Sequence, residues 1–311
     1  SLDPNGSEYA HNRVPGLTGR RDEVLVHSMY TGRVVVSAKG ARATRSNKYT
    51  DVTQNAWIGQ GNLRWMPIDR LTLSFGYNLR DVSHDAPETV VLNDFSDNNN
   101  DDTYALKPPV DALNQTVKVD ARYRAGNAVT LKAKFRHFTR ERDNGQAWKL
   151  PDKTVRDTMG GSLSVKLGKD LELLGSYTRV EVDTPSYNWD ADHEDRVTAE
   201  VRWDVADQLV IHGDYAFTHA SRDALLYDID TRLEEANGRM ERNHHALFVT
   251  AMVSALPAVS VNATWAFMQV DHAQSILFQD YNFGDPGYLE DDGAIYSEDV
   301  QVITVDIAHA P

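Results

Sequence analysis

The chain has 311 residues, of which 41% are hydrophobic, and 46 acidic against 32 basic side chains give it a formal net charge of −14. Such an acidic balance disfavours nucleic acid as a partner, because binding to phosphates requires a basic surface. The chain has no cysteine, which excludes disulfides, thiolate zinc sites and covalent haem attachment within it. No segment is a convincing membrane helix.

Two hairpins in the first half of the sequence alternate strictly between apolar and polar residues. In the hairpin from Trp57 to Arg80, which turns at Pro67–Arg70, every odd position from Leu71 to Leu79 is apolar and the positions between are polar or small. The next hairpin, over residues 117–136, repeats the pattern. Successive side chains of a strand point to opposite faces, so the pattern predicts one apolar and one polar face.

Similar patterns continue along the chain. We expect paired strands at 24–30 with 34–38, 159–167 with 171–177, 197–205 with 209–217, and 247–253 with 259–267, and a last strand at 296–308. Together these make thirteen candidate strands. The uncharged stretch 246–268 is long enough for a membrane helix. Its polar residues fall on even positions and Pro257 lies in the middle, which favours two strands and a turn.

The apolar face stays on odd numbers from Trp57 to Phe267. A two-residue hairpin would reverse this parity, so we expect turns of three or five residues, or bulges. The other connections are long, polar and acidic, at about 83–113, 142–155, 183–195, 222–242 and 271–295. Short turns at one end and long loops at the other are typical of outer-membrane barrels.

We therefore predict an all-β fold, namely a large antiparallel transmembrane β-barrel of the bacterial outer membrane with at least 14 strands, short periplasmic turns and long extracellular loops. The first and last candidate strands run in the same direction, so antiparallel closure needs at least one more. We expect a single barrel domain over residues 1–311 that is incomplete at one or both ends. A soluble β-sandwich also alternates, but its strands are shorter.

Charged side chains on the polar face gather on the hairpin from Lys118 to Arg136. Such a basic wall favours anions or an acidic protein, although any wet face carries some charge. The predicted lumen-facing charged residues are Arg64, Arg80, Lys118, Asp120, Arg122, Arg124, Lys132, Lys134, Arg136, Glu200, Arg202 and Asp204. The predicted aromatic girdle, near strand ends on the apolar face, consists of Trp57, Trp65, Tyr77, Tyr123, Tyr177, Trp203, Tyr215, Phe217, Trp265 and Phe267.

Metal and catalytic motifs are weak. The chain has eleven histidines, and the adjacent pair His244 and His245 would point to opposite faces of a strand. The loop Asp94–Asp102 offers oxygen ligands of the kind that calcium prefers, but it lacks the Gly and Glu spacing of an EF-hand. Phosphate loops, nucleophile elbows and zinc-helix motifs are absent. We predict neither an enzyme nor a metal site.

One recurring pattern resembles a known family. An aromatic-ended strand and a Pro-x-Asp-Arg-Leu-Thr-Leu turn form Trp65–Leu73, and Gly-Tyr-x-x-Arg-Asp follows at Gly76–Asp81. Echoes occur at Phe135–Asn144 and Tyr215–Asp223. The pattern is similar to large outer-membrane porins, and most similar to the barrel subunits of porin–cytochrome electron conduits, the decahaem-associated MtrB/PioB-like family. The N-terminal C-x-x-C of some members is absent.

The resemblance implies a barrel that sheathes a multihaem c-type cytochrome for electron transfer across the outer membrane. The haem would belong to this partner and the chain itself would bind no cofactor. A surface cytochrome at the extracellular loops and the lipid of the outer membrane would be further partners. Two alternatives remain open: a diffusion porin for small solutes, and a surface adhesin or receptor that acts through acidic loops such as 183–195.

Overall fold

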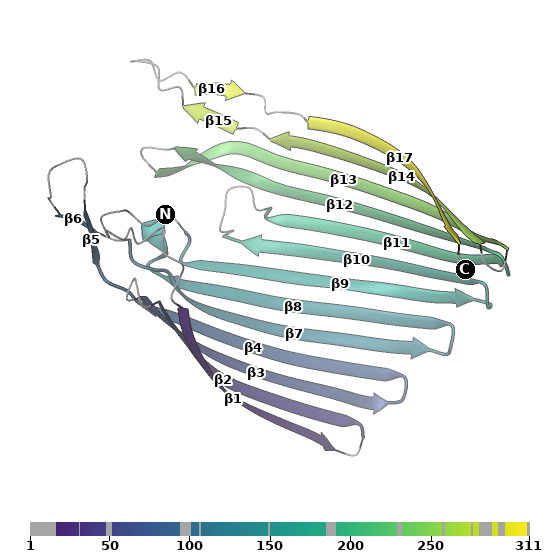
Figure 1. Cartoon of the computed structure of the whole chain (residues 1–311), viewed down its shortest axis with the longest axis horizontal. Helices are drawn as coiled ribbons and strands as arrows, with labels where there is room; N and C mark the ends of the chain where they lie inside the picture. Colours follow the sequence, from purple (N-terminus) through teal and green to yellow (C-terminus); the bar gives the residue numbers. More distant parts are fainter. Residues whose placement is uncertain are drawn as a thin grey trace. The chain divides into compact units, whose positions relative to one another are not determined.

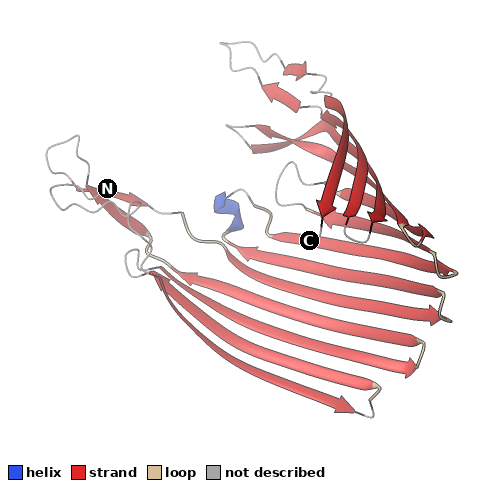
Figure 2. Ribbon diagram, turned by 45° about the vertical axis from the view of Figure 1, so that its right-hand side comes forward, coloured by secondary structure: helices blue, strands red, loops and turns tan. Residues whose placement is uncertain are grey.

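The fold is all-β, apart from one short 3-10 helix, η2 (Gly145–Trp148) (Figures 1 and 2). The computed structural model describes residues 17–30, 32–47, 52–93, 101–105, 107–148, 150–184, 191–228, 232–256, 259–274, 276–279, 288–291 and 296–309. Within these ranges, no helix has the length and apolarity that crossing a membrane requires.

Thirteen strands form one sheet in the order β1-β2-β3-β4-β7-β8-β9-β10-β11-β12-β13-β14-β17. Their bounds are β1 Leu17–Tyr30, β2 Val34–Asn47, β3 Val52–Ile68, β4 Leu71–Asp85, β7 Asp111–Ala125, β8 Val129–Asp143, β9 Lys153–Leu167, β10 Leu171–Asp183, β11 His193–Ala206, β12 Leu209–Asp228, β13 Arg232–Leu256, β14 Val259–Gln274 and β17 Tyr296–His309. Figure 1 shows short turns at one end of these strands and the longer connections at the other. The thirteen predicted strands and their antiparallel arrangement are confirmed.

The boundaries predicted on the long-loop side are wrong. The expected loop 222–242 is largely a continuation of β12 and β13, which remain paired as far as Asp228 and Arg232. The expected loops 83–113 and 271–295 contain two small hairpins, β5 (Thr89–Asn93) with β6 (Asp101–Ala105), and β15 (Ile276–Gln279) with β16 (Tyr288–Asp291). The strict alternation between apolar and polar residues ends before these strands do, as at Ala224–Tyr227, where four apolar residues follow one another. A prediction from alternation therefore stops too early.

The turns explain how the apolar face keeps its parity. Three residues separate β1 from β2, β7 from β8 and β9 from β10. Gly32, Gly126 and Gly168 in these turns have φ angles of 67°, 80° and 74°, which glycine adopts without steric cost. Three-residue connections keep facing residues on the same parity, as the sequence predicts.

Three connections are shorter, because only two residues separate β3 from β4, β11 from β12, and β13 from β14. In the β11–β12 and β13–β14 hairpins the register shifts next to the turn, between Asp204 and Ala206 and between Val253 and Leu256. The extra residue of a bulge restores the parity that a two-residue turn would reverse. Such bulges are the alternative to longer turns that the sequence allows.

The chain divides into two compact units. Unit 1 comprises Ser1–Trp65, Ser74–Lys118 and Phe138–Val155, and unit 2 comprises Met66–Leu73, Val119–His137 and Arg156–Pro311. The prediction of a single domain over residues 1–311 stays a prediction.

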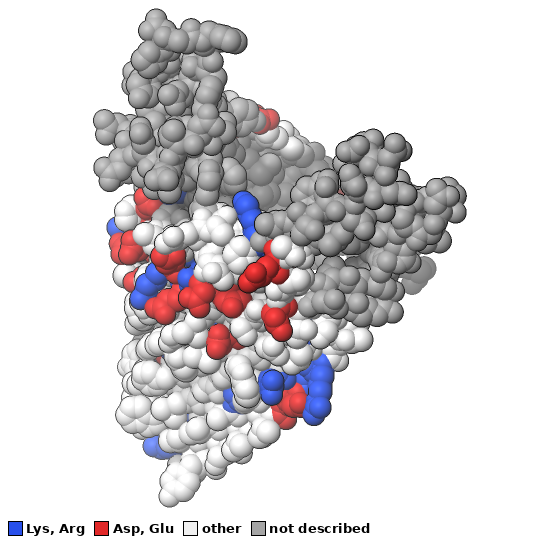
Figure 3. All heavy atoms as spheres, turned by 90° about the vertical axis from the view of Figure 1, so that its left-hand side faces the viewer, with Lys and Arg blue, Asp and Glu red and all other residues white. Residues whose placement is uncertain are grey.

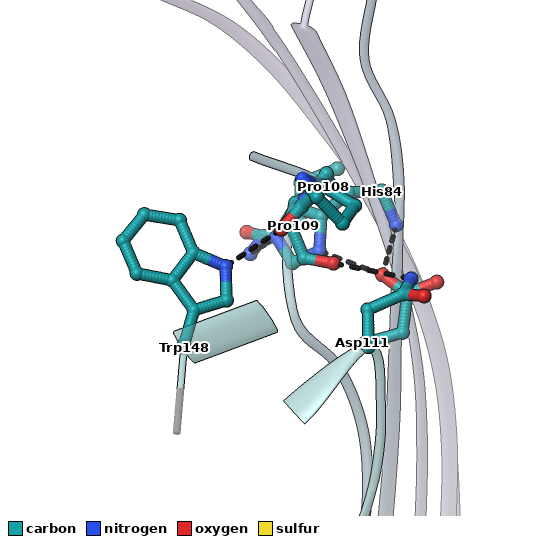
Figure 4. A network of polar contacts seen from close by, with 7 residues as sticks. His84, Pro108, Pro109, Asp111 and Trp148 are labelled. Carbon is teal, nitrogen blue, oxygen red and sulfur yellow. Dashed lines mark hydrogen bonds and ion pairs between the residues drawn. The ribbon is translucent and has the colours of Figure 1, made fainter. Parts of the chain in front are cut away.

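A polar network in unit 1 holds the long-loop ends of β4, β7 and β8 (Figure 4). The backbone amide of His84 donates to Asp111 Oδ1 at 2.8 Å, and its ring Nδ1 lies 2.9 Å from the same oxygen. The indole of Trp148 donates to the carbonyl oxygen of Pro108 at 2.7 Å. Nearby, the buried guanidinium of Arg142 donates to Pro151 O at 2.9 Å and to Thr154 Oγ1 at 3.0 Å. Part of the predicted loop 142–155 is therefore a fixed structure.

Candidate functional site

One face of the sheet presents apolar rows to the surroundings. Residues in register across antiparallel strands point to the same face. One such row crosses β10 to β17 and contains Leu173, Val201, Gly213, Val249, Trp265 and Ile303. Val201 is 38% exposed, Trp265 37% and Ile303 74%. In water, so large an exposed apolar surface would be unfavourable, whereas lipid stabilises it.

A polar row marks the long-loop limit of this apolar band. The residues in register are Arg179, Asp195, His219, Asn243, Asp271 and Ser297. They bond along the row: His219 Nδ1 lies 2.7 Å from Asn243 Oδ1, and Ser297 Oγ donates to Asp271 Oδ1 at 2.6 Å.

The apolar band spans residues 197–205 of β11, between this row and the short turn. A tilted strand crosses the hydrocarbon layer in about 9–11 residues. Strands with such a belt are the spanning elements of outer-membrane barrels, and the chain is an outer-membrane β-barrel protein. In the space-filling view of Figure 3, charged side chains likewise gather in clusters and leave uncharged surface between them.

Of the predicted girdle aromatics, the register places six on this apolar face, namely Tyr177, Trp203, Tyr215, Phe217, Trp265 and Phe267. Among all the predicted girdle aromatics, those next to the short turns are Trp65, Tyr123 and Trp203. Those farther towards the long loops are Trp57, Tyr77, Tyr177, Tyr215, Phe217, Trp265 and Phe267. All are exposed except the half-buried Phe217 and Phe267. Tyr215 shares a hydrogen bond of 3.1 Å with His245, whose ring centroid lies 4.5 Å from that of Phe217. Their role as a membrane anchor stays a prediction.

The opposite, even-numbered face of β7 and β8 carries the predicted basic wall. Its cations in unit 2 are Arg122, Arg124, Lys132, Lys134 and Arg136, which we call the basic hairpin. All five are exposed, and none forms an ion pair with another described residue. An added Cβ on Gly160 of β9 would lie 2.8 Å from Lys134 Cε, so the lysine stem lies across this glycine. The cations therefore line an open, electropositive surface.

The other charged residues predicted on β3, β4 and β7 form no ion pair with another residue that the structure describes. Arg64 on β3 and Arg80 on β4 belong to unit 1, and both are exposed. Lys118 on β7 is half-buried, with its Cβ 3.6 Å from the position of a Cβ on Gly76. Asp120 is the one carboxylate in the predicted set on the hairpin, and it is exposed.

Charges on the same face of β11 and β12 are paired instead. Arg202 Nε lies 3.4 Å from Asp204 Oδ1. His212 lies between two carboxylates, with Nε2 at 3.1 Å from Glu200 Oε1 and Nδ1 at 3.4 Å from Asp214 Oδ2. Of the predicted residues, the structure therefore brings Arg202 and Asp204 together, and places Glu200 beside two residues that the prediction omitted.

The sequence contains a pattern from which the omitted residues His212 and Asp214 could have been predicted. They are two positions apart on a predicted strand and so share a face. The three-residue connection expected between strands 197–205 and 209–217 would place Glu200 opposite Asp214. The structure has this register. By contrast, the suggested calcium loop falls mostly at 94–100, outside the described residues.

Apolar side chains interrupt the even-numbered face on β13, β14 and β17. One row in register contains Glu200, Asp214, Phe248, Ala266 and Val302. Phe248 is 38% exposed and Val302 43%, and Met252 on β13 is 37% exposed. We call Phe248, Met252 and Val302 the inner apolar patch. Ala266 lies between Phe248 and Val302 in the row, and Thr250 lies between Phe248 and Met252 on the same face of β13.

No protein-family model matches the sequence, and no curated protein matches it either. Among solved structures, the chain is similar to the copper transporter OprC, with 13% identity, a TM-score of 0.49, and coverage of 88% of this chain and 53% of the other. The outer-membrane receptor FauA from Bordetella pertussis has 11% identity and a TM-score of 0.47, with coverage of 94% and 55%.

A FadL homologue from Pseudomonas aeruginosa has 12% identity and a TM-score of 0.37, with coverage of 92% and 77%. The chain thus spans about half the length of OprC and FauA. At these identities the activities of those proteins do not carry over to this chain.

Proposed function

We propose that the chain is the barrel of an outer-membrane electron conduit and that its even-numbered face holds a multihaem c-type cytochrome. The barrel separates the haem protein from lipid, and its long loops offer a contact to a surface cytochrome. The family resemblance of the turn and strand motifs is the basis for naming this occupant. The chain supplies a polar and partly apolar inner wall, and the partner supplies the haem.

The basic hairpin supports an anionic occupant. Its five cations lie close in sequence on two adjoining strands and lack ion pairs among the described residues. Their mutual repulsion is relieved when carboxylates, such as acidic side chains or haem propionates, come against them. This charge pattern alone also suits small anions.

The inner apolar patch is the observation that favours a protein over a small solute. A hydrated solute gains little from an exposed phenyl ring, a thioether and an isopropyl group at Phe248, Met252 and Val302. A protein surface gains from covering them, because burial of apolar area is favourable by about 25 cal/mol per Å². Protein interfaces characteristically combine such apolar patches with charged surroundings.

The test is the composition of the native complex. The protein is extracted from the outer membrane in mild detergent, and its partners are identified by mass spectrometry and by a haem absorbance spectrum. We expect a c-type multihaem cytochrome in a fixed ratio to the barrel. A complex without haem would refute the proposal.

A diffusion porin is the second candidate, because the same basic hairpin would select small anions. Planar-bilayer recording separates the two. The native complex should conduct poorly because the cytochrome fills the barrel. A large anion-selective conductance in the native complex would instead favour the porin.

A further inference from the structure

We infer that Glu200, His212 and Asp214 form a binding site for a divalent transition-metal cation on the even-numbered face of β11 and β12. Each residue offers one ligand atom, and these atoms all lie within 4.8 Å of one another. The inference concerns a cation on the barrel wall, and it holds whether the barrel encloses a cytochrome or a solute path.

The sheet places the three ligands without any loop. Glu200 on β11 lies directly opposite Asp214 on β12. His212 is two residues before Asp214 on β12 and therefore shares its face. The imidazole contacts both carboxylates, at 3.1 Å from Glu200 and 3.4 Å from Asp214. Small side-chain rotations bring three such atoms to the roughly 2.0–2.2 Å that nitrogen and carboxylate oxygen take around zinc.

The ligand set decides the class of ion. One imidazole with two carboxylates suits borderline cations such as Zn²⁺, whereas Mg²⁺ and Ca²⁺ prefer oxygen ligands alone. Two carboxylates also neutralise a divalent charge. The side chains of Glu200, His212 and Asp214 are 45%, 34% and 45% exposed, so water can complete the coordination.

The surroundings do not block the site. Leu174 on β10 and Phe248 on β13 flank Glu200 and Asp214 in register and bring no competing charge. Arg202 is the cation in register with His212, and its guanidinium contacts Asp204 on the turn side. The alternative role of the cluster is a purely structural one, with the imidazole bridging two carboxylates.

Zn²⁺ binding to the purified full-length protein in detergent distinguishes these roles. After treatment with a chelator, we expect calorimetry to show one saturable Zn²⁺ site per chain that excess Mg²⁺ does not occupy. Co²⁺ should give visible absorption bands that Zn²⁺ abolishes. Substitution of a residue that only supports a metal ligand typically weakens metal binding by about 10–100-fold. Loss of the ligand itself in His212→Gln should therefore weaken Zn²⁺ binding by at least about tenfold.

His219→Gln is the matched control. His219 lies on the same strand but on the opposite face, where its ring is 2.7 Å from Asn243. This variant should bind Zn²⁺ as the unchanged protein does. Glu200→Gln provides a second ligand variant, and circular dichroism checks that all variants keep their strands. The inference is overturned if the unchanged protein has no saturable site, or if the ligand variants bind as tightly as His219→Gln.

Discussion

The hairpin β7–β8 and the strand pair β11–β12 have the same apolar outer face but opposite electrostatic designs on the inner face. The basic hairpin presents Arg122, Arg124, Lys132, Lys134 and Arg136, and they lack ion pairs among the described residues. On β11–β12, Arg202 is matched by Asp204, and His212 lies between two carboxylates.

The difference shows that charge on an inner wall has two uses. Paired charges stabilise neighbouring strands modestly, by about 0.2–1 kcal/mol for each cross-strand pair. Cations without pairs add repulsion instead, and their benefit comes only from something outside the sheet. We therefore propose that β7–β8 binds the large partner, and that β11–β12 provides local stabilisation and binds a cation.

The largest expected effect concerns the apolar outer face that β7–β8 and β11–β12 have in common. Leu131→Arg on β8 and Val201→Arg on β11 each place a charge on the apolar face, and both should lower the free energy of unfolding by about 2–4 kcal/mol. Chemical denaturation in lipid vesicles measures this loss. Lys132→Gln is the inner-face control and should change stability by less than about 0.5 kcal/mol. Equal effects at positions 131 and 132 would contradict the assignment of the faces.

Reversal of the basic hairpin tests its role in binding. The combined variant Lys132→Glu, Lys134→Glu and Arg136→Glu should reduce retention of an acidic partner by at least about tenfold, because attraction becomes repulsion. Co-purification of haem with the barrel measures retention. The control exchanges a paired couple, Arg202→Asp with Asp204→Arg, which preserves the net charge and should retain the partner. Equal losses in both variants would remove the distinction between the regions.

A smaller effect is expected at the glycine beneath the basic hairpin. In Gly160→Ala the new Cβ would lie 2.6 Å from Tyr177 O and 2.8 Å from Lys134 Cε. Such overpacking typically costs about 1–3 kcal/mol. Gly175→Ala on β10 is the matched control, because its Cβ would meet nothing within 4 Å. Unfolding in denaturant should separate the two variants, and identical midpoints would show that β9 is not held closely there.

The smallest expected effect is on stability, which should change in opposite directions in two alanine variants. His212→Ala removes two cross-strand contacts and should destabilise the protein by about 0.2–1 kcal/mol. Lys132→Ala removes one of several like charges and should leave stability unchanged or raise it slightly, most clearly at low salt. Denaturant midpoints at low and high ionic strength measure both. A loss of stability in Lys132→Ala that equals the loss in His212→Ala would show that Lys132 has a partner.

The sequence predicts the spanning part of the fold well, because lipid requires apolar residues at every second position of a strand. It locates thirteen strands, and the constant parity predicts the three-residue turns and the bulges. It fails at the long-loop ends, where strands such as β12 and β13 continue beyond the alternating pattern and remain paired as far as Asp228 and Arg232.

The polar face is only partly predictable. The basic hairpin can be read from the alternation of Lys132, Lys134 and Arg136 within one strand. The cluster of Glu200, His212 and Asp214 requires, in addition, the register between two strands. Constant parity allows either a longer turn or a two-residue turn with a bulge, and the structure has the bulge, between Asp204 and Ala206.

The most direct test of the proposed sheath is photo-crosslinking from single positions of the native protein in the outer membrane. A photo-activatable residue at position 134, on the inner face of β8, should form an adduct with a c-type cytochrome that is visible by haem staining. The same residue at position 131, on the outer face, should give none. The sheath is contradicted if position 134 yields no haem-containing adduct while the protein is folded and abundant.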